Sequence, residues 1–102
     1  MPLTAAQKKR LRGQAHHLKP LVTVADKGLS ESVIAEIKRA LYDHELIKVK
    51  LAVGSREART AVAEEICTRS GAELVQQIGN VVLLLRRTPK PDPKLSNLIR
   101  PL

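Results

Sequence analysis

The pattern of apolar and polar residues follows the helical period in three stretches of the chain. The first stretch has capping-box spacing from Thr4 and continues until Pro20 forbids a helix. The second begins at Ser30 and the third at Ser55, which are residue types that cap helices, and Gly71 can end the third in a left-handed conformation. The apolar positions expected to face inward are Leu11, Ala15, Leu18, Val33, Ile34, Ile37, Leu41, Ala58, Ala61, Val62 and Ile66.

Two further stretches have the composition of strands. Residues 21–24 are short, apolar and rich in β-branched side chains, which is typical of a buried strand. Residues 46–53 alternate with the strand period, so apolar side chains lie on one face and Lys48 and Lys50 on the other. We therefore expect one face of this strand in the core and the other face wet or lightly covered.

The last two strands are expected at residues 72–78 and 81–87. Gly79 and Asn80 join them as a two-residue turn, which is typical of an antiparallel hairpin. The final strand opens with five consecutive apolar residues, so both of its faces should be covered. Two helices on one side and the first helix on the other would do this.

The order of elements is a helix followed by βαβαββ, which predicts an α/β domain on a mixed four-stranded sheet with helices packed on it. A chain of 102 residues is long enough for one modest core. We expect a single domain over residues 1–87. Residues 88–102 contain four prolines and scattered charges, which predicts a basic tail with little capacity to fold alone.

The formal net charge of +8 is concentrated at the two ends of the chain. The first twenty residues carry five basic side chains and no acidic ones, and residues 86–102 carry five basic side chains against Asp92. The residues between them are nearly neutral. A neutral body with two basic ends is typical of a protein that binds a polyanion.

Other classes of function have little support in the sequence. The longest apolar run, residues 81–85, is too short to span a bilayer, and the lone Cys67 permits no disulfide within the chain. We therefore expect a cytoplasmic protein with no membrane partner, and a monomer when free. His16 and His17 are adjacent, which is not metal-ligand spacing, and no matched acid and base stand out. We expect no enzyme activity, metal, cofactor or small-molecule substrate.

The segment between the first strand and the second helix could bind a phosphate. A helix entrance has unpaired backbone N–H groups, Gly28 permits positive φ and close approach of a ligand, and Lys27 adds a charge. Asp26 counts slightly against a phosphate. An ordinary connection that needs glycine for its geometry explains the same stretch equally well.

Structured RNA is the polyanion that fits the composition best. Tyr42 is the sole aromatic residue, so a platform of aromatic rings for stacking bases is not available, whereas contacts to phosphate, ribose or helical shape are. The basic face of the first helix and the glycine turn are the central contacts. The full set of expected RNA-binding residues is Lys8, Lys9, Arg12, His16, Lys19, Asp26, Lys27, Gly28, Lys48, Lys50, Arg56 and Arg86.

Several stretches together resemble one known family. They are LRGQAHHLKP (residues 11–20), the glycine turn followed by LSESV, HELIKVKL (44–51), and GAELVQQIGN (71–80) leading to LLLRR. In this order they are similar to the bacterial single-domain proteins of the YhbY type, members of the CRM family, named for chloroplast RNA splicing and ribosome maturation. The resemblance runs from about residue 3 to residue 87.

The resemblance implies an RNA-binding domain similar in fold to the carboxyl-terminal domain of translation initiation factor three. It also implies a role in assembly of the large ribosomal subunit, with ribosomal RNA as partner, whereas plant relatives assist group II intron splicing. The family's G-x-x-G loop falls on residues 25–28, where Ala25 replaces the first glycine. The alternative from another class is a protein-protein adaptor whose basic ends bind an acidic partner.

Overall fold

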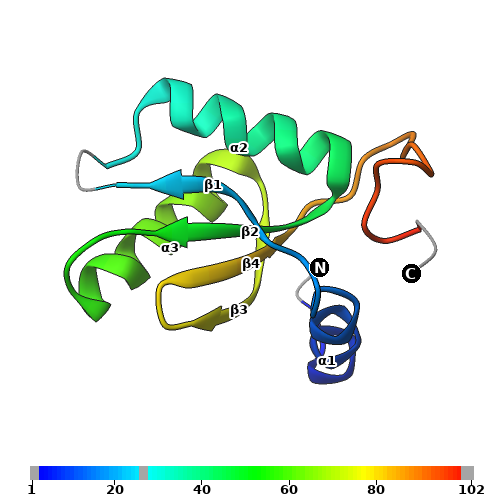
Figure 1. The fold of residues 1–102 in the computed structure, drawn as a ribbon, viewed down its shortest axis with the longest axis horizontal. Coiled ribbons are helices and arrows are strands. Elements are labelled where there is room, and N and C mark those ends of the chain that lie inside the picture. The colour runs from blue at the N-terminus through cyan, green and yellow to red at the C-terminus, as the bar shows by residue number, and fades with distance from the viewer. Residues whose placement is uncertain (1–2, 26–27, 100–102) are drawn as a thin grey trace.

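The computed structural model describes residues 3–25 and 28–99, and in these ranges it shows three helices and four strands in the predicted order (Figure 1). No helix in these ranges combines the length and the apolar content that crossing a bilayer requires. The elements are α1 (Ala5–Gln14), β1 (Pro20–Val24), α2 (Glu31–His44), β2 (Leu46–Leu51), α3 (Arg56–Ser70), β3 (Glu73–Ile78) and β4 (Val81–Leu85).

The four strands form one mixed sheet in the order β1-β2-β4-β3. β1 is parallel to β2, as expected for strands joined through a helix, and β4 is antiparallel to both β2 and β3. Gly79, with φ of 56°, and Asn80 form the predicted hairpin turn between β3 and β4. The prediction of a mixed four-stranded α/β fold is confirmed.

One face of the sheet is closed by α2 and α3, which lie together on that side (Figure 1). The side chains of Ile47, Val49 and Leu51 point to this face, in agreement with the alternation in the sequence. β4 adds Val82 and Leu84, and the helices add Ile37, Leu41 and Ile66. This cluster is the main core of the domain.

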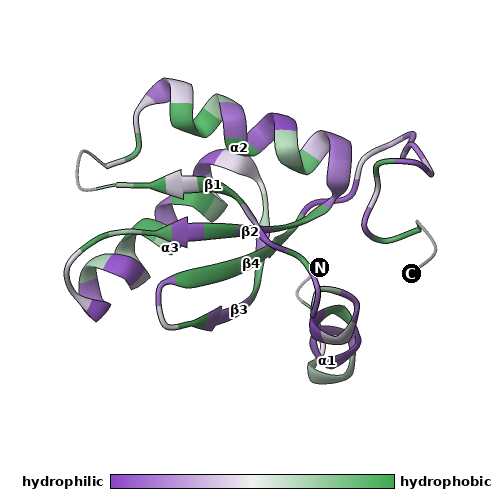
Figure 2. Ribbon diagram, in the orientation of Figure 1, coloured by the Kyte–Doolittle hydropathy of each residue, from purple (hydrophilic) through white to green (hydrophobic). Residues whose placement is uncertain are grey.

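The opposite face of the sheet is partly covered by α1 and is called the α1 face below. Leu11 and Ala15 pack there against Leu83 and Leu85 of β4, together with Leu46 and Val75. β4 therefore has apolar neighbours on both sides, and it is coloured as hydrophobic along its length in Figure 2. The prediction that both faces of the last strand are covered is confirmed for residues 82–85, whereas Val81 is half-buried.

The predicted helix caps are confirmed. The Thr4 hydroxyl accepts a hydrogen bond from the Gln7 N–H at 3.1 Å, and the Gln7 side chain accepts one from the Thr4 N–H at 2.9 Å. Ser30 and Ser55 cap α2 and α3 in the same way, accepting from backbone N–H groups three residues later. Gly71 ends α3 in the left-handed conformation with φ of 76°.

Two details of the helices differ from the prediction. α1 ends at Gln14, so His16, Leu18 and Lys19 lie in the connection to β1 and not on the helix. Gly13 weakens the last turn, and the Leu18 N–H donates to the Ala15 carbonyl at 2.9 Å to turn the chain. Leu18 still packs beside the α1 cluster.

In α3, Ala61 is exposed and Ala63 is buried, contrary to the expected stripe. Ile66 is the largest apolar side chain of this helix and is fully buried, so it determines which side faces the sheet. Ala63 and Ser70 share that side with Ile66 at spacings of three and four residues.

The last three strands are also shorter than the sequence predicts. β2 stops at Leu51, β3 begins at Glu73 and β4 stops at Leu85. The Leu51 N–H donates to the Asn80 carbonyl at 2.6 Å, so pairing of β2 ends where the hairpin turn begins.

Residues 88–99 pack against the junction of α2 and β2. Glu45 follows α2 with φ of 62°, and its buried carboxylate accepts hydrogen bonds from the Thr88 N–H and the Ser96 hydroxyl, both at 2.7 Å. The Asn97 side chain donates to the Leu46 carbonyl at 2.7 Å, and Leu98 lies against the α1 cluster. The proline-rich segment thus obtains its order from contacts with the sheet and α2.

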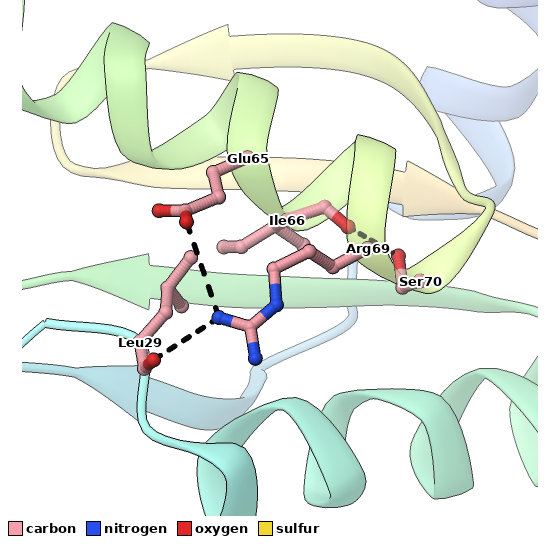
Figure 3. Close-up of polar contacts among 5 residues, drawn as sticks. All are labelled: Leu29, Glu65, Ile66, Arg69 and Ser70. Atoms are coloured by element: carbon pink, nitrogen blue, oxygen red, sulfur yellow. Dashed lines mark hydrogen bonds and ion pairs between the residues drawn. The ribbon is translucent and has the colours of Figure 1, made fainter.

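Arg69 connects the end of α3 to the entrance of α2 (Figure 3). Its Nη1 donates to the Leu29 carbonyl at 3.2 Å and lies 3.9 Å from the Glu65 carboxylate. In the same turn the Ser70 hydroxyl donates to the Ile66 carbonyl at 2.6 Å. These contacts hold the segment that follows Gly28 against α3.

Candidate nucleic-acid interface

α1 presents its basic residues to solvent because its apolar side is narrow. Leu11 is buried against the sheet, whereas Lys9 and Arg12 are exposed and Lys8 is half-buried. Arg10, which the expected set omitted, is exposed on the same helix. In Figure 2 most of α1 is coloured as hydrophilic, in contrast to the strand β4 above it.

The connection from α1 to β1 continues the basic surface. His16 and Lys19 are both exposed there, and Lys19 lies near Lys48 of β2, because the two side chains line the same hollows. The prediction that His16 and Lys19 lie on a helix is wrong, but both side chains are exposed to solvent. A loop lets these cations lie closer to the sheet than the outer side of α1 does.

Lys48 and Lys50 lie on the α1 face of β2. Leu46 precedes them at the same alternation and is fully buried under the α1 cluster, whereas Lys48 is half-buried and Lys50 is exposed. α1 lies at the end of the sheet away from the β3–β4 turn (Figure 1). The face is therefore closed at one end and open at the other, where the two lysines lie.

Arg86 lies near the amino-terminal end of α1, away from the connection to β1. Its backbone N–H donates to the Glu45 carbonyl at 2.9 Å, and its guanidinium lies beside Gly71. A hollow of about 600 Å³ brings it together with Thr4 and Gln7 from the start of α1. Glu73 lines the same hollow and accepts a hydrogen bond from the Leu3 N–H at 3.1 Å, so this end of the surface is less positive than the rest.

The glycine turn is described only in part, since Asp26 and Lys27 lie outside the described residues. Gly28 has φ of 81°, and its N–H donates to the Ala25 carbonyl at 2.9 Å. Among the described residues, positive φ outside glycine is found at Glu45 alone, so Ala25 has ordinary backbone geometry. Alanine is therefore compatible with the turn at the place of the family's first glycine.

Arg56 opens α3 and has a neighbour that the sequence analysis missed. Arg59 lies one turn later, and the two arginines line a hollow of about 360 Å³ with Gln77 and Gly79. The Arg59 Nη1 donates to the Val53 carbonyl at 3.4 Å, while its buried Nε has no hydrogen-bond partner among the described residues. The spacing of three residues from Arg56, in the first turn of a capped helix, was the available signal.

The predicted residues fall into two groups at opposite ends of the sheet. The Ala52 N–H donates to the Val24 carbonyl at 2.7 Å, which places the ends of β1 and β2, and with them Gly28 and Arg56, at one end. α1 and Arg86 lie at the other end (Figure 1). Lys48 and Lys50, together with Lys19, lie between the two groups on the α1 face.

Other potentially reactive groups have structural roles. The Cys67 thiol packs beside the main core, and burial raises its pKa, with a smaller contribution from the charge of Glu73. A protonated thiol is a poor nucleophile at neutral pH. His44 Nδ1 donates to the Leu95 carbonyl at 2.8 Å, which anchors the tail. Within residues 3–25 and 28–99, no three histidine, cysteine or acidic side chains gather as metal ligands.

Comparison with known proteins assigns the family. Residues 3–86 match the model of the CRS1/YhbY (CRM) domain, and the chain belongs to this family. It is similar to a Pseudomonas aeruginosa protein named as a probable RNA-binding protein, at 52% identity over 98% of this chain and 96% of that one. A Haemophilus influenzae protein named as an RNA-binding protein is 43% identical over 91% of this chain and 92% of its own length.

The fold also matches that of a solved structure. The solution structure of a hypothetical Staphylococcus aureus protein, described as a candidate RNA-binding protein, superposes with a TM-score of 0.77 at 32% identity. The match covers 86% of this chain and 92% of the other. The predicted resemblance to the CRM family is thus confirmed from both sequence and structure.

Proposed function

We propose that this protein binds structured RNA on the α1 face and its adjoining basic ends, and that it catalyses no reaction on the RNA. The observation that carries the proposal is the run of exposed and half-buried cations from α1 through Lys19 to Lys48 and Lys50. Among the described residues, the ion pair found is that of Arg69 with Glu65, so protein carboxylates do not neutralise this run. The names of the relatives support the same class of ligand.

The chemistry of such a surface favours the phosphate backbone. Each phosphate that a lysine or arginine neutralises releases condensed counterions, so several cations on a rigid surface give salt-dependent affinity without a deep pocket. The groups lie on three different elements, and they therefore fit a folded RNA better than an extended single strand. Gly28 and the start of α3 offer further phosphate contacts at the open end of the sheet.

We further assign the RNA to the precursor of the large ribosomal subunit. This part of the proposal rests on the resemblance to the single-domain bacterial members of the family. In-cell crosslinking followed by sequencing of the attached RNA tests it directly. We expect large-subunit ribosomal sequences to dominate; enrichment of messenger RNA alone would contradict the assignment, and recovery of protein partners after nuclease digestion would favour the adaptor instead.

Binding itself is tested by fluorescence anisotropy with a structured ribosomal RNA fragment at several salt concentrations. The double variant Arg12→Glu with Lys27→Glu should lower the magnitude of the slope of log K against log salt by about two, if each cation contacts one phosphate. The matched control is Lys38→Glu with Arg39→Glu, which reverses two exposed charges on α2. Equal affinity of the wild type and the first variant would contradict the proposed surface.

A further inference from the structure

The open part of the α1 face contains a hollow of about 310 Å³ to which all four strands contribute. Its apolar lining comes from Val81 and Leu83 of β4, Ile78 of β3 and Leu18 of the connection before β1. The volume lies at the lower end of the range for small-ligand sites. This hollow begins where the cover provided by α1 ends.

Ile78 is unusually exposed for its residue type. It is a large β-branched residue at the end of an edge strand, and 64% of its surface is accessible. With Leu18, Val81 and Leu83 of the adjoining hollow it forms a continuous apolar surface, and such surfaces mark contacts with a partner. The other large apolar side chain of comparable exposure, Tyr42 at 62%, lies on α2 and away from this face.

Two lysines line this hollow and give it a positive charge. Lys19 and Lys48 both line it, and both also line a neighbouring hollow of about 250 Å³ that includes His17. The two lysine residues therefore lie at the boundary between the hollows. An anion bound between Lys19 and Lys48 would have the apolar lining of the first hollow on one side and His17, which lines the second hollow, on the other.

Gln76 completes the lining with an amide that can both donate and accept hydrogen bonds. An amide of this kind matches the mixed donors and acceptors on the edge of a nucleobase. The flat faces of a base are suited to the aliphatic walls, and its phosphates are suited to Lys19 and Lys48. A perfectly paired helix would leave this apolar surface without a partner.

We propose that this hollow receives the base of one unpaired nucleotide of the bound RNA, with Lys19 and Lys48 holding the adjoining phosphates. The inference rests on the proposed RNA-binding function and adds a preference for RNA that has a bulge or a splayed loop residue. Aliphatic walls provide weaker contacts than aromatic rings, so the preference is moderate.

The test compares three RNA hairpins that share one helix. One has a single bulged nucleotide, the second has an abasic residue at the same position, and the third is fully paired. We expect the wild type to bind the bulged hairpin about fivefold more tightly than the abasic one, which is less than an aromatic platform would give. Ile78→Ala should bring this ratio close to one, whereas the matched control Tyr42→Ala should leave it unchanged.

The outcomes separate the subsite from the general function. Equal, salt-dependent binding of all three hairpins by the wild type overturns the base-binding hollow and leaves RNA binding intact. Absence of binding to any of them in dilute buffer overturns both proposals. The ratio of affinities for the bulged and abasic hairpins is measured on the wild type, so it does not depend on the folding of any variant. Thermal unfolding of Ile78→Ala checks that the protein tolerates the substitution at this exposed position.

Discussion

The two faces of the sheet differ in how completely they are closed. The face under α2 and α3 is apolar and fully covered, and its strand residues Val49, Leu51 and Leu84 have no exposed surface. The α1 face is covered at one end, by Leu11 and Ala15, and open at the other. One side of these strands therefore forms the core that specifies the fold. The other side presents charged residues to solvent.

This division explains how so basic a chain remains folded. Burying an unpaired ammonium group is costly, whereas an exposed one stays hydrated. Lys48 and Lys50 alternate with fully buried neighbours on β2, so their charges lie on the α1 face without entering the main core. Most of the fully buried apolar side chains lie on the closed face, whereas the open face presents cations to solvent.

The largest expected effect is the loss of a side chain from the closed face. Leu84→Ala should lower the free energy of unfolding by about 2 to 5 kcal/mol, because a fully buried leucine leaves a cavity. Urea denaturation measures the change. Ile78→Ala, on the open face, should cost less than about 0.5 kcal/mol. Equal losses at the two positions would contradict the comparison.

The tail should contribute less than the closed face but more than a surface residue. Ser96→Ala removes the hydroxyl that donates to the buried Glu45 carboxylate, which should cost about 1 to 3 kcal/mol of unfolding free energy. Thr68→Ala on α3 is the control, because its side chain is exposed. If both variants unfold at the same urea concentration as the wild type, the tail is not bound through Glu45.

A smaller effect is expected when one cation of the open face is removed. Lys48→Ala should reduce the magnitude of the salt slope of RNA binding by about one and weaken binding several-fold. Lys38→Ala, which removes a charge from α2, should leave the slope unchanged. A slope that changes equally in both variants would show that RNA does not distinguish the two sides of the molecule.

The smallest effect concerns Cys67 beside the closed face. Its raised pKa, caused mainly by burial and secondarily by Glu73, means that the folded protein holds the thiol proton to higher pH than the unfolded chain. The folded state therefore keeps this contribution to its stability at neutral pH. It loses the contribution as the pH rises through the pKa of the thiol in the folded protein. Iodoacetamide should alkylate the native thiol more slowly than in urea; equal rates would contradict this assignment.

The local features of the fold could be predicted from the sequence. Caps at Thr4, Ser30 and Ser55 and the stop at Gly71 depend on neighbouring residues, and all four are confirmed. The five apolar residues of β4 likewise indicated cover on both faces. Ala61 was misplaced because alanines contribute too little area to determine the orientation of a helix.

Features that depend on distant residues could not be predicted in this way. The strand order and the contacts of Glu45 with Thr88 and Ser96 join segments more than forty residues apart. The part of the candidate surface that lies on α1 and β2 followed from periodicity and charge. Arg59 and the hollow beside Ile78 emerged only when the sheet brought separate segments together.

The most direct test of the central claim is an NMR titration of the labelled protein with a structured ribosomal RNA fragment. The account predicts that backbone amide signals of Lys9 and Arg12 on α1, and of Lys48 and Lys50 on the α1 face, change position as RNA is added. Signals of Lys38 and Arg39 on α2 should remain unchanged. Changes confined to the outer side of α2 and α3 would contradict the assignment of the α1 face as the RNA-binding surface.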